Sequence, residues 1–306
     1  MRAKNIKSVL RNKFKSYLDS IDDTSVREVV RLNAIITGGS IASMLMGEKP
    51  NDFDVYFKTK DAVLRVAKYY VSRWKQNPPM RFKGDPSRTC SVHVEDMEDR
   101  VRIVVKSVGV AAEDGSVDYQ YFEQADAEAD TQDFVDQVMS DAKDATDNDD
   151  KPKYRPVFLT SNAITLSHDI QLVIRFYGSI DQIHENYDFV HCTCAWDALT
   201  GELTLPPKAL ESLLTKELVY KRSKYPLCSI IRTRKFISRG WKINAGQYVK
   251  MAWDLNKLNL TDPGVLEDQM VGVDAAYFQQ VIDLLKEKCG DKIDETYLME
   301  VIDRVF

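Results

Sequence analysis

The feature that most constrains this 306-residue chain is a glycine pair between two short apolar segments. Gly38 and Gly39 follow the apolar run 34–37 and precede Ser40, which opens a second apolar run. Glycine lets the backbone turn sharply and approach a ligand closely, because it has no Cβ. Ser40 and the amides after it are expected at a helix N-terminus, where free N–H groups and the helix dipole favour anions. The segment therefore predicts a strand, a tight turn and a helix whose start binds phosphate.

Two carboxylates follow this turn after a short interval. Asp52 and Asp54 flank Phe53 in a run that is typical of a strand. Side chains alternate along a strand, so Asp52 and Asp54 are expected on one face while Phe53 and Val55 point into the core. Neighbouring carboxylates repel each other unless a cation lies between them, and hard oxygen ligands suit Mg²⁺ or Mn²⁺. The sequence thus predicts a metal site beside a phosphate-binding turn.

The ordered pair of motifs, Gly38-Gly39-Ser40 and Asp52-x-Asp54, resembles the signature of the DNA polymerase beta-like nucleotidyltransferases. The resemblance is strongest over residues 34–57. Within this superfamily the chain is similar to viral and phage poly(A)-polymerase-like proteins. It implies an α/β (α+β) fold, with a nucleotidyltransferase-type mixed sheet, flanking helices and a C-terminal helical domain. It also implies a metal-dependent enzyme that uses two metal ions to move NMP from an NTP to an acceptor hydroxyl with release of pyrophosphate. The favoured acceptor is an RNA 3′ end, extended without a template in the host cytoplasm.

A third carboxylate completes such sites in the superfamily, usually from the middle of an apolar strand, and Gln171 occupies that place here. The preferred substitute is Asp188, which opens an apolar run similar to a strand of viral poly(A)-polymerase-like proteins. Asp169 is the alternative ligand, on the same face as Gln171 if that strand extends far enough. A site with two carboxylates, or a degenerate one, stays open. The resemblance therefore implies these catalytic residues and metal ligands: Asp52, Asp54 and Asp188.

Hydrophobic periodicity predicts the remaining elements. Helical patterns occupy 5–19, 24–32, 60–74, 179–186, 209–220, 227–238, 244–258, 274–288 and 295–305. The second of these is expected to start at a cap on Asp23 or Thr24. Besides the Asp-x-Asp strand, strand patterns occupy 34–37, 91–94, 100–111, 157–159, 163–166, 170–176 and 187–193. This alternation predicts a mixed sheet with helices packed on it.

The net charge of −5 hides a strong asymmetry along the chain. Residues 113–150 carry roughly fourteen acidic side chains against one lysine, which predicts a solvated acidic insertion at about 112–153. Residues 208–257 carry about twelve Lys and Arg against three acids. The pattern changes to helices beyond Leu205-Pro206-Pro207, so we place a domain boundary there. With the resemblance, this predicts a nucleotidyltransferase catalytic domain over 1–205 and a basic helical domain over 206–306.

The basic domain is expected to bind the nucleotide and the substrate. Several cations on adjacent helices suit the charge of a triphosphate or of nucleic-acid phosphates. Interleaved aromatic side chains such as Tyr225 could stack on bases. Its predicted substrate-binding residues, in addition to Gly38, Gly39 and Ser40 of the turn, are Lys216, Arg222, Arg232 and Lys235.

The five cysteines are odd in number and scattered, which argues against a disulfide framework and for a reducing compartment. His191, Cys192 and Cys194 suggest a zinc site, but a strand over 189–194 would place His191 on the face opposite both cysteines. We interpret these two cysteines as core residues. No apolar run approaches the length that spans a bilayer, so no membrane partner is expected.

Three alternative functions are weighed against RNA extension. A CCA-adding enzyme fits less well, because that family usually follows the paired glycines with Val-Arg-Asp, whereas this chain has Ser40-Ile41-Ala42. Nucleotidylation of a protein or a small molecule is the second enzymatic hypothesis. The third is a catalytically silent nucleotide-binding module, which Gln171 at the place of the third acid motivates.

Overall fold

The structure is a computed structural model that describes residues 1–76, 92–104, 153–270, 296 and 299. The predicted acidic insertion and the predicted helices at 274–288 and 295–305 lie almost entirely outside these ranges. No helix within the described ranges is long and apolar enough to cross a membrane.

Within the described ranges, seven strands form one sheet in the order β5-β6-β7-β2-β1-β8-β9. Their bounds are β1 Ala34–Thr37, β2 Phe53–Phe57, β5 Pro156–Leu159, β6 Ala163–Leu166, β7 Ile170–Tyr177, β8 Ala195–Asp197 and β9 Leu203–Thr204. The pair β2 and β7 is parallel and the other pairs are antiparallel, so the predicted mixed sheet is confirmed. A separate antiparallel pair consists of β3 His93–Asp96 and β4 Val101–Val104.

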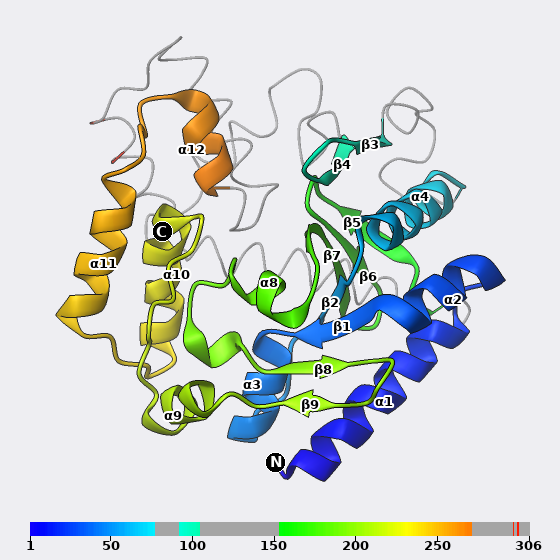
Figure 1. The fold of residues 1–306 in the computed structure, drawn as a ribbon, viewed down its shortest axis with the longest axis horizontal. Coiled ribbons are helices and arrows are strands. Elements are labelled where there is room, and N and C mark those ends of the chain that lie inside the picture. The colour runs from blue at the N-terminus through cyan, green and yellow to red at the C-terminus, as the bar shows by residue number, and fades with distance from the viewer. Residues whose placement is uncertain (77–91, 105–152, 271–295, 297–298, 300–306) are drawn as a thin grey trace, which may run out of the picture.

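Amphipathic helices seal one side of this sheet. They are α1 Ala3–Asp19, α2 Thr24–Asn33 and α4 Lys60–Gln76. In α1, Ile6, Leu10 and Phe14 recur every four residues and are buried, so they form one apolar stripe. The predicted N-cap of α2 is confirmed, because the Asp23 carboxylate accepts hydrogen bonds from two backbone N–H groups of the first turn. Figure 1 shows these three helices together on one side of the molecule.

The helix that follows the glycine turn is fixed at its far end. This helix, α3 (Gly39–Met46), ends at Gly47 in the left-handed conformation. The Glu48 N–H donates to the Ser43 carbonyl at 2.8 Å, and the Met1 ammonium donates to the Met44 carbonyl at 3.0 Å. Both bonds satisfy carbonyls that a helix end leaves free. The direction of α3, and of the turn at its start, is therefore set.

The second half of the described chain is mainly helical from residue 207 onward. It contains α9 Pro207–Thr215, α10 Pro226–Ser238, α11 Ala245–Leu255 and α12 Pro263–Met270, which Figure 1 shows beside the sheet. The helix predicted to run to residue 220 ends earlier, because Lys216 adopts a left-handed conformation with φ of 50°. The sequence analysis missed α12, since its Pro263-Gly264 start is typical of a turn.

The strand predicted over 187–193 is wrong. The short helix α8 (Ile180–His184) leads instead to a loop with one 3₁₀ turn, η2 (Val190–Cys192). Phe189 forms an isolated bridge with Tyr220, and the Val190 N–H donates to the Val219 carbonyl at 3.0 Å. The run is apolar because it is buried between the sheet and the helical segment, so hydrophobicity alone could not identify a strand.

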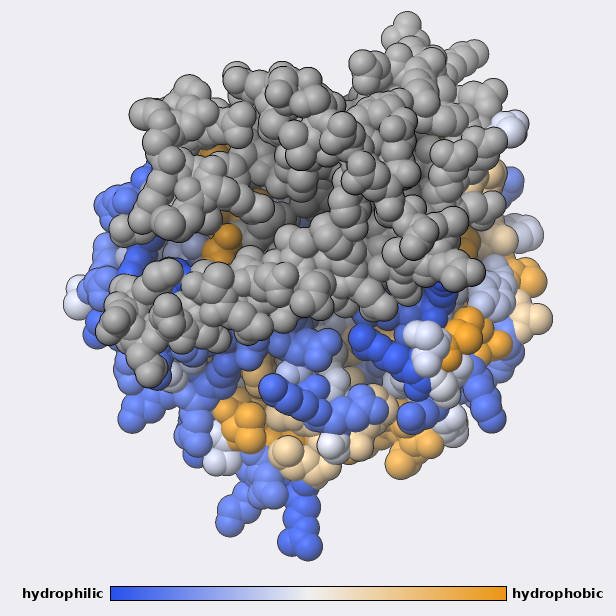
Figure 2. Space-filling view, turned by 180° about the vertical axis from the view of Figure 1, so that it is seen from behind, coloured by the Kyte–Doolittle hydropathy of each residue, from blue (hydrophilic) through white to orange (hydrophobic). Residues whose placement is uncertain are grey.

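Of the two cysteines that were predicted to be core residues, Cys194 is buried and Cys192 is partly buried, and both are free thiols. The expected separation of His191 from Cys192 by strand alternation does not hold, since both lie in η2. The described part of the rear face mixes hydrophilic side chains with small, separate apolar patches, as Figure 2 shows.

Candidate active site

The glycine turn lies directly against the acidic strand. Gly38 has φ of +100° and ψ of −151°, a conformation that L side chains rarely adopt. A Cβ on Gly38 would lie 3.0 Å from Asp54 Oδ2 and 3.5 Å from the Tyr187 hydroxyl. The structure thus brings the two sequence motifs together, and a side chain at Gly38 would collide with the carboxylate.

The two carboxylates lie at the start of β2, with Asp52 just before the strand and Asp54 within it. Both are half-buried. Burial raises the pKa of Asp54 well above its ordinary value, the negative charge of Asp52 raises it further, and the positive charge of Arg232 opposes both. A divalent cation at this place would offset the repulsion, and two carboxylates are the hard oxygen donors that Mg²⁺ or Mn²⁺ takes. The residues present fit a magnesium or manganese ion.

The first turn of α3 offers hydrogen-bond donors to an anion. Ser40 is only 3% exposed, and among the described residues its Oγ has no hydrogen-bond partner. The first N–H groups of any α-helix also lack a partner within the helix, and they carry the positive end of the helix dipole. Gly38, Gly39 and Ser40 therefore form a start of helix that can receive phosphate oxygens beside Asp54.

A buried hydrogen-bond network holds the end of β1, directly before the glycine turn. The Thr37 hydroxyl donates to the Cys194 carbonyl at 2.9 Å and lies 2.7 Å from His184 Nε2. Since its proton is already used, Thr37 accepts from a protonated Nε2. Burial, and after it the charge of Lys221, lowers the pKa of His184 to about 4, so the ring is a neutral imidazole at neutral pH. Sequence reasoning missed this pair, because its members are 147 residues apart.

Asp188 lies in an ion pair with Arg232. The Arg232 Nη1 donates to Asp188 Oδ2, and the side chain of Asp188 is 7% exposed while that of Arg232 is 38% exposed. Among the residues that the structure describes, no three or more His, Cys, Asp or Glu side chains form a group that could hold a metal. Asp188 therefore does not converge with Asp52 and Asp54 here, and its role as a metal ligand stays a prediction.

Gln171 occupies the neighbouring-strand position that sequence reasoning assigned to it. Its Cα is in register with Asp54 across the parallel pair of β2 and β7. The strand does not extend to Asp169, which was the condition for Asp169 to share a face with Gln171, because β7 begins at Ile170 and Asp169 adopts a left-handed turn conformation with φ of 54°. The Asp169 carbonyl accepts from the Phe53 N–H at 2.9 Å, so its backbone helps to set the start of β2.

The other predicted substrate-binding cations lie on the helical segment. Lys216 follows α9 and is exposed, Arg222 lies in the exposed loop before α10 with φ of 79°, and Lys235 is half-buried in the last turn of α10. Their roles in binding stay predictions. Tyr187 is a site residue that the sequence analysis did not single out, although it directly precedes Asp188.

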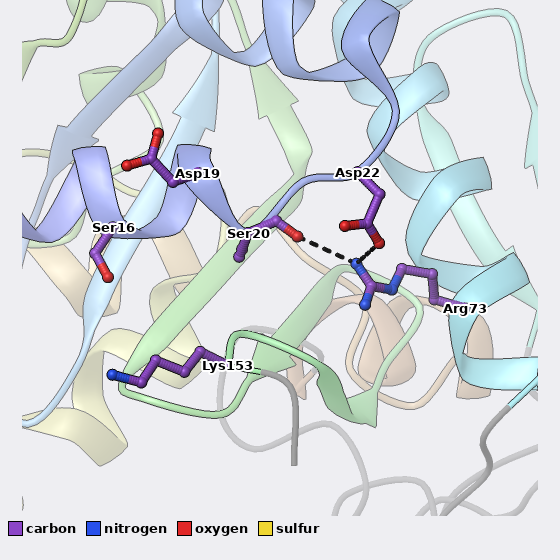
Figure 3. Close-up of a pocket in the computed structure, with 6 residues that line it drawn as sticks. All are labelled: Ser16, Asp19, Ser20, Asp22, Arg73 and Lys153. Atoms are coloured by element: carbon purple, nitrogen blue, oxygen red, sulfur yellow. Dashed lines mark hydrogen bonds and ion pairs between the residues drawn. The ribbon is translucent and has the colours of Figure 1, made fainter. Parts of the chain in front are cut away.

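A shallow pocket of about 400 Å³ lies elsewhere, at the end of α1. Its residues, shown in Figure 3, are Ser16, Asp19, Ser20, Asp22, Arg73 and Lys153. Arg73 is bonded to Asp22 and to the Ser20 carbonyl, each at 3.3 Å. Because its two acids balance its two cations, this pocket has no excess charge with which to attract a triphosphate.

Comparisons with known proteins found a matching family model, a curated phage relative and similar solved structures. The sequence model of the Gabija anti-defense 2 family protein matches residues 8–216. A curated relative, "Gabija anti-defense 2" of Bacillus phage SPbetaL7, is 22% identical over 133 residues. That match covers 43% of this chain and 32% of the relative, so it spans about a third of the relative's length.

Two solved structures of CCA-adding enzymes are similar in fold. One is the Thermotoga maritima enzyme complexed with tRNA, at a TM-score of 0.40 and 12% identity, covering 95% of this chain and 68% of that one. The other is the Bacillus stearothermophilus enzyme in complex with CTP, at a TM-score of 0.38 and 12% identity, covering 88% of this chain and 51% of that one.

Proposed function

The chain belongs to the Gabija anti-defense 2 family, and from the geometry of its site we propose that it is a metal-dependent nucleotidyltransferase. The observation that carries the proposal is the contact of the glycine turn with the acidic strand, where a Cβ on Gly38 would lie 3.0 Å from Asp54 Oδ2. A phosphate on the start of α3 would therefore lie next to the carboxylates that suit a divalent cation.

Each group of the site has one task in this reaction. The N–H groups at Gly39 and Ser40 hold the β- and γ-phosphates, and Gly38 allows their close approach. Asp52 and Asp54 hold Mg²⁺ or Mn²⁺, which when bound polarises phosphate and hydroxyl oxygens. The network of Thr37 and His184 fixes the turn below the nucleotide. Positioning and charge neutralisation supply most of the rate enhancement.

The transfer step balances without a further co-reactant. The acceptor oxygen forms a bond to the α-phosphorus of the NTP while the bond from that phosphorus to the bridging oxygen breaks. Pyrophosphate leaves with the electron pair of the broken bond, and the proton of the acceptor hydroxyl passes to water. No covalent enzyme intermediate is required, which agrees with a site of phosphate donors and carboxylates.

The proposed acceptor is an RNA 3′ end in the cytoplasm of a phage host. Support comes from the concentration of cations in the helical segment, where Lys216, Arg222 and Lys235 would contact phosphates of the RNA. We assign catalysis to residues 1–205 and acceptor binding to 206–306. The name of the phage relative includes anti-defense, so we extend the proposal to an action against a host defence system.

A silent nucleotide-binding module is the second candidate, and one observation favours it. Gln171 is in register with Asp54, so the neighbouring strand offers a neutral amide to the site. This candidate predicts nucleotide binding without turnover and without a need for divalent metal.

One assay separates these functions. The purified protein is incubated with each radiolabelled NTP, Mg²⁺ or Mn²⁺ and a pool of short RNA oligomers, beside an Asp52→Ala/Asp54→Ala variant. We expect lengthened RNA that is lost in the variant. Label on a protein or a small molecule would replace RNA as the acceptor. Nucleotide binding without any transfer would support the silent module and contradict the enzyme.

A further inference from the structure

Arg232 is a cation that the fold inserts among the acids of the site. Its Nη1 forms an ion pair with Asp188 Oδ2. Asp188 directly follows Tyr187, whose hydroxyl lies 3.5 Å from the place of a Cβ on Gly38, and that place lies 3.0 Å from Asp54 Oδ2. In this position the positive charge of Arg232 also acts on Asp54, whose pKa it lowers against the effects of burial and of Asp52. One guanidinium on α10 thus serves carboxylates from two distant parts of the chain.

Aromatic packing holds Arg232 in this place. Phe236 follows Arg232 by one helical turn on α10, so both side chains lie on one face of the helix. The Phe236 ring packs against Phe189 at 5.4 Å and against His191 at 4.8 Å, between ring centroids. Phe189 directly follows Asp188 in the loop, and His191 comes two residues after Phe189. The ion pair is therefore built into the packing of α10 on the loop, and it does not depend on two flexible side chains meeting.

The other titratable groups around Arg232 carry no charge at neutral pH. Burial raises the pKa of the Cys192 and Cys228 thiols to about 12 each, and burial lowers the pKa of His191 to about 4. The Lys221 ammonium is directed away, to the His184 carbonyl at 2.8 Å. When Asp52, Asp54 and Asp188 are ionised, three carboxylates against one guanidinium leave two negative charges, which one divalent cation neutralises.

We propose that Arg232 supplies the second positive charge of the site, so that the transfer uses one divalent cation on Asp52 and Asp54 instead of two. Asp188 is then a positioning residue that anchors Arg232, and it is not a metal ligand. The inference rests on the proposed function and deepens it. Gln171, the uncharged residue in register with Asp54, fits a site that holds no second metal ion.

The exposure of Arg232 suits this task. Its side chain is 38% exposed, while that of Asp188 is 7% exposed, so the guanidinium closes over a buried carboxylate and keeps part of its surface free. A guanidinium has five N–H donors in a fixed plane and stays charged at any physiological pH. The donors not used by Asp188 can bind phosphate oxygens of the nucleotide, and they stabilise the charge that develops on leaving pyrophosphate.

The test counts bound manganese. The purified chain is saturated with α,β-methylene ATP, which cannot be cleaved at the α–β bond, and Mn²⁺ is added while electron paramagnetic resonance reports the free ion. We expect one bound Mn²⁺ per chain and nucleotide. A count of two in the unaltered chain overturns the inference and leaves the proposed function standing. The absence of both Mn²⁺ and nucleotide binding overturns both.

Variants of α10 sharpen the count. Arg232→Gln removes the guanidinium and frees Asp188, so we expect two bound Mn²⁺, whereas an unchanged count of one contradicts the inference. Arg232→Lys keeps the charge, and its expected count is one. Arg234→Gln is the matched control, since Arg234 is exposed on the same helix, and its count stays at one. Should Arg232→Gln fail to fold, the count in the unaltered chain still decides.

Discussion

The two faces of strand β2 meet opposite environments. Phe53, Val55 and Phe57 point into the main core, and each is at most 5% exposed. Asp54 and Tyr56 alternate with them and point to the face where the glycine turn, Tyr187 and Arg232 lie. One face of the strand stabilises the fold through burial, and the other holds half-buried charge at a cost in solvation. Substitutions one residue apart should therefore separate stability from activity.

The largest expected effect is on the charged face. Asp54→Asn keeps the shape of the side chain and removes a charge that faces the proposed metal and phosphates. We expect nucleotide transfer to fall by about a thousand-fold or more, since such groups act on the transition state. The free energy of unfolding should stay equal or rise, because burial disfavours the charged carboxylate.

Rates of labelled nucleotide transfer and thermal unfolding test this expectation together. Asp61→Asn is the matched control, since Asp61 pairs with Arg65 on the exposed side of α4 and should leave the rate unchanged. A variant at Asp54 that keeps its activity but unfolds early would show that Asp54 belongs to the stability of the fold.

The core face should respond in the opposite way. Phe57→Ala removes a fully buried ring, and we expect the free energy of unfolding to fall by about 3–5 kcal/mol, with the rate per folded molecule preserved. Urea unfolding followed by fluorescence measures the first quantity, and transfer assays at low temperature measure the second. A decrease in the free energy of unfolding of less than about 1 kcal/mol would mean that the core around residue 57 can close the cavity left by the ring.

The glycine turn lies on the charged face and also requires an unusual backbone conformation, so a substitution there should lower both activity and stability, each by a smaller amount. Gly38→Ala forces a side chain into a conformation that glycine alone adopts readily, at a cost of about 1–3 kcal/mol in stability. The new Cβ also displaces the Asp54 carboxylate, so transfer should fall by about a hundred-fold.

Gly246→Ala is the control for this substitution. Nothing lies within 4 Å of a Cβ at Gly246 in α11, so the change should stabilise the protein by about 0.5–1 kcal/mol. Denaturant unfolding measures the free energy of unfolding of both variants. Equal changes at the two glycines would contradict a special role of the turn.

The smallest effect is a pH dependence of stability below neutrality. Burial lowers the pKa of His184 and of His191 to about 4, below the ordinary value of 6.5. Between these values the unfolded chain binds more protons than the folded chain, so stability rises with pH from about 4 to 6.5 and then levels off. Urea unfolding from pH 5 to pH 7.5 measures this slope.

The variant His184→Gln isolates one of the two histidines. It should flatten the dependence, because glutamine cannot titrate. A slope that stays unchanged would show that His184 does not contribute, and that the network with Thr37 does not hold it neutral.

Local patterns predicted much of the fold. The amphipathic stripe of α1 and the cap at Asp23 were predicted correctly, because such signals depend on residues close in sequence. The glycine turn and the Asp-x-Asp strand were also predicted as elements from 34–57. The loop around η2 was not, since burial from both sides makes a loop as apolar as a strand.

The site was less accessible to prediction because its parts are distant in sequence. Asp188 and Arg232 were each singled out, yet nothing in the sequence indicated that they pair across 44 residues. Gln171 was placed beside the acidic strand because the superfamily usually has its third acid in the middle of an apolar strand. Its register with Asp54 is set only when β2 and β7 pair. Tertiary contact, which no local pattern encodes, decides these relations.

The position of Arg232 also has a consequence for synthesis on the ribosome. At about 5–20 residues per second, Asp54 leaves the ribosome about 10 to 35 s before Arg232. A nascent chain that already contains the glycine turn, the Asp-x-Asp strand and Asp188 therefore still lacks Arg232. It has the carboxylates without the guanidinium that pairs with Asp188 and acts on Asp54. Under the proposed role of Arg232, transfer requires translation past α10, so a truncated polypeptide that ends earlier would contain both motifs of the proposed enzyme and lack its activity.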